Sequence, residues 1–224
     1  MFYILQLLLR DRKSAIRQVL ETQQKTRDIL LMLGLSLTCF ALYGMVIGSS
    51  QCLLQGLSAS LKLPLLFYSC SFICFPSLYF FSSFLGMRQN SRQLIHFIVL
   101  CNTYISLVLM ALAPVSFFFL IAAYHYALFK FINILIFSVA GLTGILLFYQ
   151  EFNRMMFDPQ DQLKSKKSLL FIKLWAILFA FIGLQLSFTM SPFFGIPEAP
   201  FILFTPEKSN FFMNLAETIG LIFE

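Results

Sequence analysis

The residue types that usually perform chemistry inside a membrane are nearly absent from the apolar parts of this chain. No Asp or Glu lies within any of its five long apolar stretches, and Lys62, Lys130 and Lys173 stand near the ends of these stretches. Long basic side chains at such positions usually reach the lipid headgroups. His96 and His125 also stand at stretch ends. Since ionisable groups at depth mark most proton and ion pathways, the sequence argues against a coupled carrier.

Motifs of soluble or metal-dependent catalysis are missing as well. The chain has no HExxH zinc motif and no GxSxG nucleophile elbow. Cys70 and Cys74 would share a helix face, but no His or second Cys pair completes a metal set. We therefore predict that the protein is not an enzyme and that it uses no metal and no cofactor.

A few uncharged polar residues remain within the stretches, namely Asn102, Ser106, Asn133 and Gln185. Such groups most often form hydrogen bonds between helices, each contributing about 1 kcal/mol. They could instead line a path for a small uncharged solute. We predict the first role, and a channel or carrier for such a solute is the alternative.

The elements that must position these residues are the apolar stretches themselves, at 29–49, 62–86, 94–122, 127–149 and 168–190. Each has the roughly 20 residues that a transmembrane helix needs. Apolar residues form 59% of the chain and charged residues 12%, which a soluble domain of this size could not accommodate. We predict an all-α, polytopic integral membrane protein with a bundle of five transmembrane helices. Pro114, well inside the third span, predicts either one kinked or tilted helix or a helix followed by an interfacial turn.

The positive charges sort into alternate connections. Thirteen of the 16 Lys and Arg residues lie in the N-terminal segment, the second loop and the fourth loop, whereas the other three flanks hold only Lys62, Lys130 and Lys208. The positive-inside rule then places the N-terminus in the cytoplasm and the C-terminus outside, in a membrane that we predict to be the bacterial inner membrane. Because the net charge of +6 comes from these loops, it does not indicate a nucleic-acid partner.

Three regions are predicted along the chain: an arm at 1–28, the transmembrane domain at 29–190 and a Pro- and Phe-rich loop with a short terminal segment at 191–224. The arm is predicted to be an amphipathic interfacial helix that places Arg10, Arg12, Lys13 and Arg17 at the headgroups of the lipid bilayer. A partly ordered cytosolic arm is the alternative, and no cleavable signal peptide is expected. Residues 51–61 predict a short amphipathic helix at the outer interface.

Small residues mark the expected helix contacts. Gly44 and Gly48 form a GxxxG pair in the first span, and Ala180 and Gly183 lie on one face of the fifth. Small residues let helix backbones approach closely in a membrane, so these four are predicted packing positions. Whether such a contact joins two copies of the chain stays open, and both a homo-oligomer and a different membrane protein partner are expected possibilities.

Several segments together resemble a group of uncharacterised bacterial multi-pass membrane proteins, and more loosely the YIP family. The segments are ALYGMVIGSS, LLQGLSASLKLPLLF, ICFPSLYFF, ALAPVSFFFL and GLQLSFTMSPFFG. The last motif departs from the family pattern, which often has Trp at Phe188 and Arg at Ser191. Some members are labelled as actin-binding WASP-homology proteins, but the nearest basic match here, residues 163–166, lacks a preceding amphipathic helix. The resemblance implies a multi-helix membrane fold and no defined activity.

These observations predict a non-catalytic accessory or organising protein that binds a membrane partner or lipid. The predicted partner-binding residues are Pro192, Phe193, Phe194 and Gly195, which offer apolar anchors without charge on the outer side. The alternative is that this loop only caps the bundle.

Overall fold

The computed structural model describes residues 26–84, 91–122, 126–156, 162–194 and 201–204. Within these ranges the chain is all-helical and contains no strand. The helices are α3 (Thr26–Gly48), α4 (Leu53–Phe84), α5 (Ser91–Ala122), α6 (Tyr126–Met156) and α7 (Gln162–Thr189). All five are long and apolar enough to cross a membrane, which confirms this part of the predicted fold. The interfacial helix predicted at 1–28 lies almost entirely outside the described residues.

Local sequence explains where α3 starts and stops. The helix begins at Thr26 with Asp28 in its first turn, where a carboxylate favours the partial positive charge of the helix terminus. At the other end, the hydroxyls of Ser49 and Ser50 donate to the carbonyl oxygens of Val46 (2.8 Å) and Ile47 (3.1 Å). These two serines satisfy carbonyls near the C-terminus of α3, where the ending helix supplies no further backbone donors.

The boundaries of α4 correct one prediction. A separate interfacial helix was expected at 51–61, followed by a span from residue 62, but the structure has a single 32-residue helix from Leu53 to Phe84. Pro64 and Pro76 lie inside it. A proline removes one hydrogen bond and bends a helix, yet in a membrane neighbouring helices hold the bent helix together. In the same way α5 continues through Pro114 as one helix, which is the first of the two forms expected for this span.

The polar segment at 150–167 is also more helical than expected. It is the predicted fourth loop, yet α6 continues to Met156 and α7 already begins at Gln162. Gln, Glu, Arg, Met and Lys dominate this segment and are good helix formers, so both helices extend beyond their apolar stretches. Only residues 157–161, which include Asp158-Pro159, fall outside the described helices.

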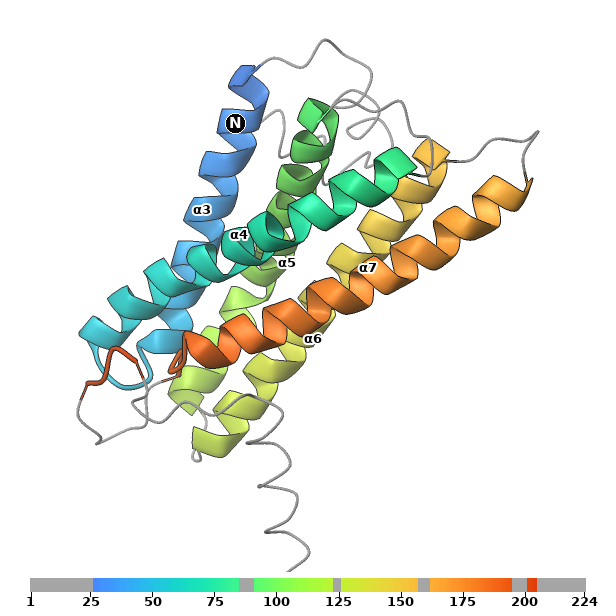
Figure 1. Ribbon diagram of the computed structural model, residues 1–224. Helices are drawn as coiled ribbons and strands as arrows, with labels where there is room; N and C mark the ends of the chain where they lie inside the picture. The colour runs from blue at the N-terminus through green and yellow to red at the C-terminus, as the bar shows by residue number, and fades with distance from the viewer. Residues whose placement is uncertain (1–25, 85–90, 123–125, 157–161, 195–200, 205–224) are drawn as a thin grey trace, which may run out of the picture.

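Successive helices run in opposite directions (Figure 1). The helix α3 packs against α4 and α5, α5 packs against α6, and α7 packs against α4 and α6. In Figure 1, α4 and α7 cross in front of the other three at an inclination. We call the end where α3, α5 and α7 begin the basic end, because Arg27, Arg92 and Lys164 stand there. The opposite end, where α4 and α6 begin, is the capped end.

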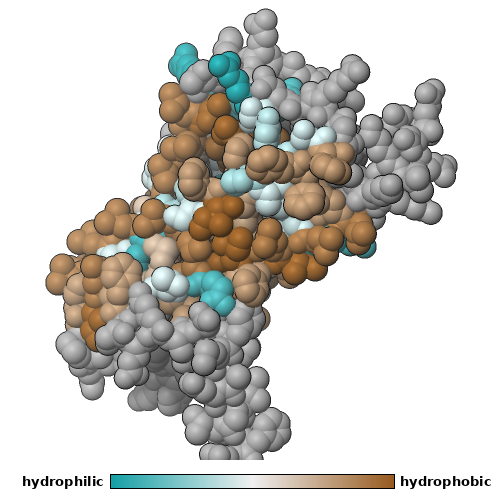
Figure 2. Space-filling view, in the orientation of Figure 1, coloured by the Kyte–Doolittle hydropathy of each residue, from teal (hydrophilic) through white to brown (hydrophobic). Residues whose placement is uncertain are grey.

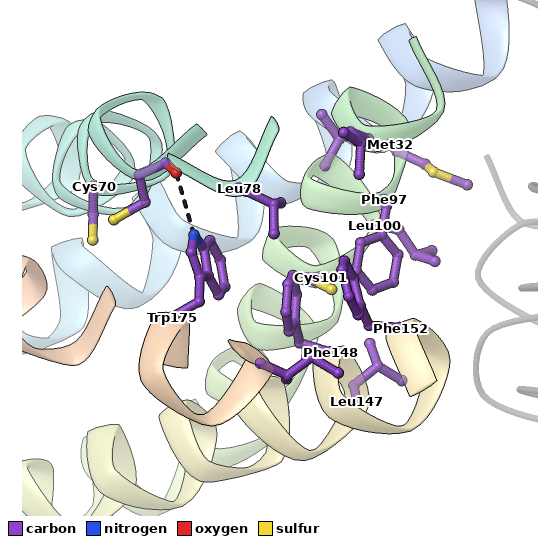
Figure 3. Close-up of a cluster of buried hydrophobic side chains, with 14 residues drawn as sticks. Met32, Cys70, Leu78, Phe97, Leu100, Cys101, Leu147, Phe148, Phe152 and Trp175 are labelled. Atoms are coloured by element: carbon purple, nitrogen blue, oxygen red, sulfur yellow. Dashed lines mark hydrogen bonds between the residues drawn. The ribbon is translucent and has the colours of Figure 1, made fainter. Parts of the chain in front are cut away.

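Two clusters of buried apolar side chains fill the bundle. The cluster at the basic end joins all five helices and includes Phe97, Phe148, Phe152 and Trp175 (Figure 3). The cluster at the capped end contains Phe40, Tyr43, Leu63, Leu109 and Phe193 among others.

The outer surface is apolar too, and the face seen in Figure 2 is largely hydrophobic. Phe72 of α4 is 80% exposed and Ile177 of α7 is 66% exposed. Soluble monomers rarely leave so much contiguous apolar surface in water. Together with the five apolar helices, this surface indicates a protein that is embedded in a membrane.

Candidate functional site at the capped end

Three polar side chains lie on one face of the first turns of α4 and are buried. Gln55 is 0% exposed, Lys62 5% and Ser58 8%. At 100° per residue these positions fall within about 60° of arc, so they face the same neighbours. Uncompensated burial of such groups is costly, and a charged group is the most costly of all. Their partners therefore define the site.

The Lys62 ammonium group points inward to backbone carbonyls. Its Nζ donates to the carbonyl oxygens of Pro192 (3.2 Å) and Leu203, and it lies 4.7 Å from the centroid of the Phe204 ring. The Gln55 Nε2 donates to the same Pro192 oxygen at 2.9 Å. We call residues 191–194 and 201–204 the capping segment, because these bonds fasten it to α4. The segment contains a cis peptide bond between Ser191 and Pro192.

The sequence did not reveal this role for Lys62. Its place near the end of an apolar stretch indicated a side chain that reaches out to the headgroups, but at 5% exposure it is turned into the protein. Hydropathy along the chain cannot tell which face of a helix a lysine occupies. The signal that was present is the spacing of Gln55, Ser58 and Lys62 on one face, opposite the leucines of the same turns.

Two buried polar atoms of this face have no hydrogen-bond partner among the described residues: the Gln55 Oε1 and the Ser58 Oγ. Within the described ranges the Gln55 amide is thus satisfied on its nitrogen side only. Both atoms lie one turn apart on α4, on the face that also carries Lys62.

The predicted partner-binding residues sit beside this site. Phe193 is 8% exposed and belongs to the buried cluster of the capped end, and the Phe194 ring meets the Phe129 ring edge to face at 6.2 Å. Pro192 contributes the carbonyl that Lys62 and Gln55 share. Gly195 lies outside the described residues. Phe193 is therefore part of the protein's own core and is not a free anchor in this conformation, because the segment folds back between the helix ends.

The predicted packing glycines of α3 lie where α3 and α4 cross. A Cβ added at Gly44 would lie 2.5 Å from the carbonyl oxygen of Ala59, and one added at Gly48 would lie 2.5 Å from that of Gln55. Backbone atoms cannot yield as a flexible side chain can. The absence of side chains at these two positions therefore allows the first turns of α4, with their polar face, to lie directly on α3.

The packing positions of α7 behave differently. A Cβ added at Gly183 would meet the Cys70 Sγ at 3.7 Å, an ordinary contact distance. Ala180 is exposed. The close contact predicted at Ala180 is thus not made within one chain, because α7 presents a neighbouring face, with Trp175, to α4.

Two of the four residues predicted to line a possible pore, Asn102 and Asn133, form hydrogen bonds between helices. The Asn133 Oδ1 accepts hydrogen bonds from the Tyr43 hydroxyl (2.8 Å) and the Ser116 hydroxyl (2.7 Å). Its Nδ2 donates to the Phe129 carbonyl at 2.9 Å. This amide therefore joins α3, α5 and α6.

The other three pore candidates do not share the hydrogen bonds of Asn133. The Asn102 Nδ2 donates to the Ser71 hydroxyl at 2.8 Å, and the Ser106 hydroxyl donates to the Thr103 carbonyl at 2.7 Å. Gln185 is half-buried on α7. The predicted headgroup residues Arg10, Arg12, Lys13 and Arg17 lie outside the described residues. Within the described ranges, no three His, Cys, Asp or Glu side chains gather as a metal site would require.

Comparisons of the chain with protein-family models, curated proteins and solved structures find no match. The resemblance to YIP-like membrane proteins therefore stays a prediction.

Proposed function

We propose that the protein is a non-catalytic integral membrane protein that acts as an accessory or organising subunit, and that it binds another membrane protein along α7. The observation that carries this proposal is that the polar side chains inside the bundle are bonded to neighbouring helices. Asn102 and Asn133, which a solute path would need, are buried and hydrogen-bonded to side chains of neighbouring helices. Polar groups that are fixed in this way hold a bundle together and offer little to a passing solute.

The exposure of α7 is the reason for placing the partner on this helix. Only 11% of the residues along its apolar stretch are buried in the chain, against 28–33% for the other four helices. Leu174, Ile177 and Phe181 are all at least 49% exposed on it, beside the small residue Ala180. A small side chain among apolar ones lets a second helix approach closely. The partner is either a different membrane protein or a second copy of this chain.

The predicted topology and lipid contacts belong to the same proposal. The N-terminus lies in the cytoplasm of a bacterial cell, the protein lies in the inner membrane, and the C-terminus lies outside. Arg10, Arg12, Lys13 and Arg17 bind anionic headgroups. The orientation of the helices supports this, because the helix ends that carry Arg27, Arg92 and Lys164 all meet at one end of the bundle.

Site-specific photo-cross-linking tests the partner surface. A photoreactive residue at Ile177 on α7 should give one stoichiometric cross-linked product in native membranes. The same residue at Leu142 on α6, which is similarly exposed (60% against 66%), should give mainly lipid adducts. Identical product patterns at the two positions would argue against a binding surface on α7.

Flux through the purified protein in liposomes tests the alternative. The proposal expects no solute-specific flux above that of empty liposomes. A solute-specific flux that is abolished by Asn102→Leu, in a variant that still unfolds at the wild-type midpoint, would replace the accessory role with a channel or carrier.

A further inference from the structure

The first turns of α4 have their polar and apolar faces reversed relative to a helix at a water-exposed surface. The buried face carries Gln55, Ser58 and Lys62, whereas the outer face carries leucines that are 51–79% exposed: Leu53, Leu54, Leu57 and Leu61. In water the arrangement would be the opposite, with the charge outside and the leucines inside. An apolar outer face around a polar interior is the arrangement that hydrocarbon surroundings favour.

The length of α4 points the same way. Its 32 residues span about 48 Å at 1.5 Å per residue, and large apolar side chains are exposed at both ends, at Leu53 (79%) and Phe84 (94%). The hydrocarbon core of a bilayer is only about 30 Å thick. A helix of this length keeps both ends in or near that core only by inclining. Figure 1 shows α4 inclined to α3, so the two helices cannot both stand upright in a bilayer.

The capping segment combines exposed apolar side chains with carbonyl groups that are bonded to buried donors. It is non-helical, so its carbonyl groups lack the partners that a helix provides, and Phe201, Ile202, Leu203 and Phe204 are each 40–50% exposed. At a water-exposed surface, water would satisfy the carbonyl oxygens of Pro192 and Leu203. Here a buried ammonium and a buried amide donate to them. Protein donors of this kind are needed where water is scarce.

We propose that the capping segment lies among lipid acyl chains, at their boundary with the headgroups of the adjacent leaflet. Phe201–Phe204 contact the acyl chains, and Lys62 and Gln55 supply the hydrogen bonds that lipid cannot supply. Lys62 is therefore a positioning residue that holds this segment at depth. This inference concerns the membrane placement of the chain, and it does not depend on the proposed partner surface on α7.

Depth-dependent quenching tests the placement. Trp175 is the only tryptophan, so Phe201→Trp in a Trp175→Phe background gives a single probe. In pure lipid vesicles we expect strong quenching by lipids brominated near the top of the acyl chain and weak quenching by aqueous acrylamide. Phe72→Trp, on the exposed face of α4, is the matched probe for lipid contact. Strong acrylamide quenching with no bromolipid quenching would overturn the proposal.

A cysteine probe avoids a bias of the first test, because tryptophan itself prefers membrane interfaces. Ile202→Cys, in a background in which the five native cysteines are serine, should react with a membrane-impermeant maleimide several-fold more slowly in vesicles than after full denaturation. Fast labelling in pure lipid vesicles would show that the segment lies in water, free to meet a protein partner, and would also overturn the proposal.

The role of Lys62 has its own test. Lys62→Met removes the donors, so the segment should move toward water and Ile202→Cys should label several-fold faster, whereas Lys62→Arg should retain protection. Lys130→Met, at an exposed lysine of the same end, is the control and should change nothing. Unchanged protection in Lys62→Met, with Trp175 emission as in the parent, would remove Lys62 from the proposal.

Discussion

At the basic end of the bundle, large aromatic rings fill the space between α4, α5, α6 and α7. At the capped end, α3 and α4 are in backbone contact at Gly44 and Gly48, where no side chain would fit. The Trp175 ring stacks on that of Phe148, with centroids 4.3 Å apart and planes at 17°. At Gly48, by contrast, even one added Cβ would lie 2.5 Å from a backbone oxygen. Helix packing thus depends on large side chains at the basic end and on the absence of side chains at the capped end.

The polar groups differ between the ends as well. The rings at the basic end carry one polar contact in Figure 3, from the Trp175 Nε1 to the Cys74 carbonyl oxygen at 3.3 Å. The capped end holds Asn133 with its three partners and Lys62 with its carbonyls. Lipid tails are as apolar as the side chains, so packing and hydrogen bonds must supply the specificity of helix association. The two ends use these two means in different proportions.

Removing volume should affect the basic end most. Trp175→Ala leaves a cavity beside Phe148, and it should lower the free energy of unfolding by about 3–5 kcal/mol. Trp175→Phe keeps one aromatic ring but loses part of the indole volume and the bond to Cys74, so it should cost less, about 1–2 kcal/mol. Reversible unfolding in mixed detergent micelles measures both. A Trp175→Ala variant as stable as Trp175→Phe would contradict volume-dependent packing.

Adding volume should affect the capped end. Gly44→Ala and Gly48→Ala push α4 away from α3, and each should cost about 1–3 kcal/mol. Gly34→Ala is the matched control on the same helix, because a Cβ there meets nothing within 4 Å. It should stabilise α3 by up to about 1 kcal/mol through helix propensity. The same unfolding measurement decides, and equal effects at Gly34 and Gly44 would contradict the close crossing.

Removing the shared acceptor tests the polar part of the comparison. Asn133→Leu leaves the hydroxyls of Tyr43 and Ser116 without their acceptor, and we expect a loss of about 1–2 kcal/mol. Tyr43→Phe alone should cost less. The loss of stability in the double variant should be smaller than the sum of the losses in the two single variants, which a double-mutant cycle measures. Strict additivity would mean that the bond between Tyr43 and Asn133 contributes nothing.

The smallest effects are expected on α7. Gly183→Ala makes only an ordinary contact with Cys70, and Ala180→Leu adds volume at an exposed site, so each should change stability by less than about 0.5 kcal/mol. If α7 binds a partner, Ala180→Leu should still reduce the cross-linking yield at Ile177. A large loss of stability in Ala180→Leu for the purified protein would instead place Ala180 inside the bundle.

Much of the fold could be predicted because hydropathy is a property of the chain itself. The five helices appear within a few residues of their apolar stretches, with three exceptions: α4 begins nine residues early at Leu53, α6 extends to Met156 and α7 begins at Gln162. The early start of α4 was missed because Gln55, Ser58 and Ser60 interrupt the apolar run before residue 62. The extensions of α6 and α7 were missed because polar helix formers resemble a loop in hydropathy. The candidate site was predicted only in part. The partner-binding role of the SPFFG motif stays a prediction, and the motif did not indicate that Phe193 faces inward or that Lys62 binds the carbonyl of Pro192.

The sequence by itself determined that the described part of this chain forms five long apolar helices, and that 13 of the chain's 16 Lys and Arg residues fall in alternate connections. These properties follow from composition and order, since a bilayer selects helices by apolar length alone. Only the tertiary structure decided that Gly44 and Gly48 form a backbone contact, whereas Gly183 forms a loose one. It also decided that Lys62 turns inward to hold the capping segment. Both depend on which face of each helix meets which neighbour, and in a chain that is apolar on every side, periodicity does not specify that face.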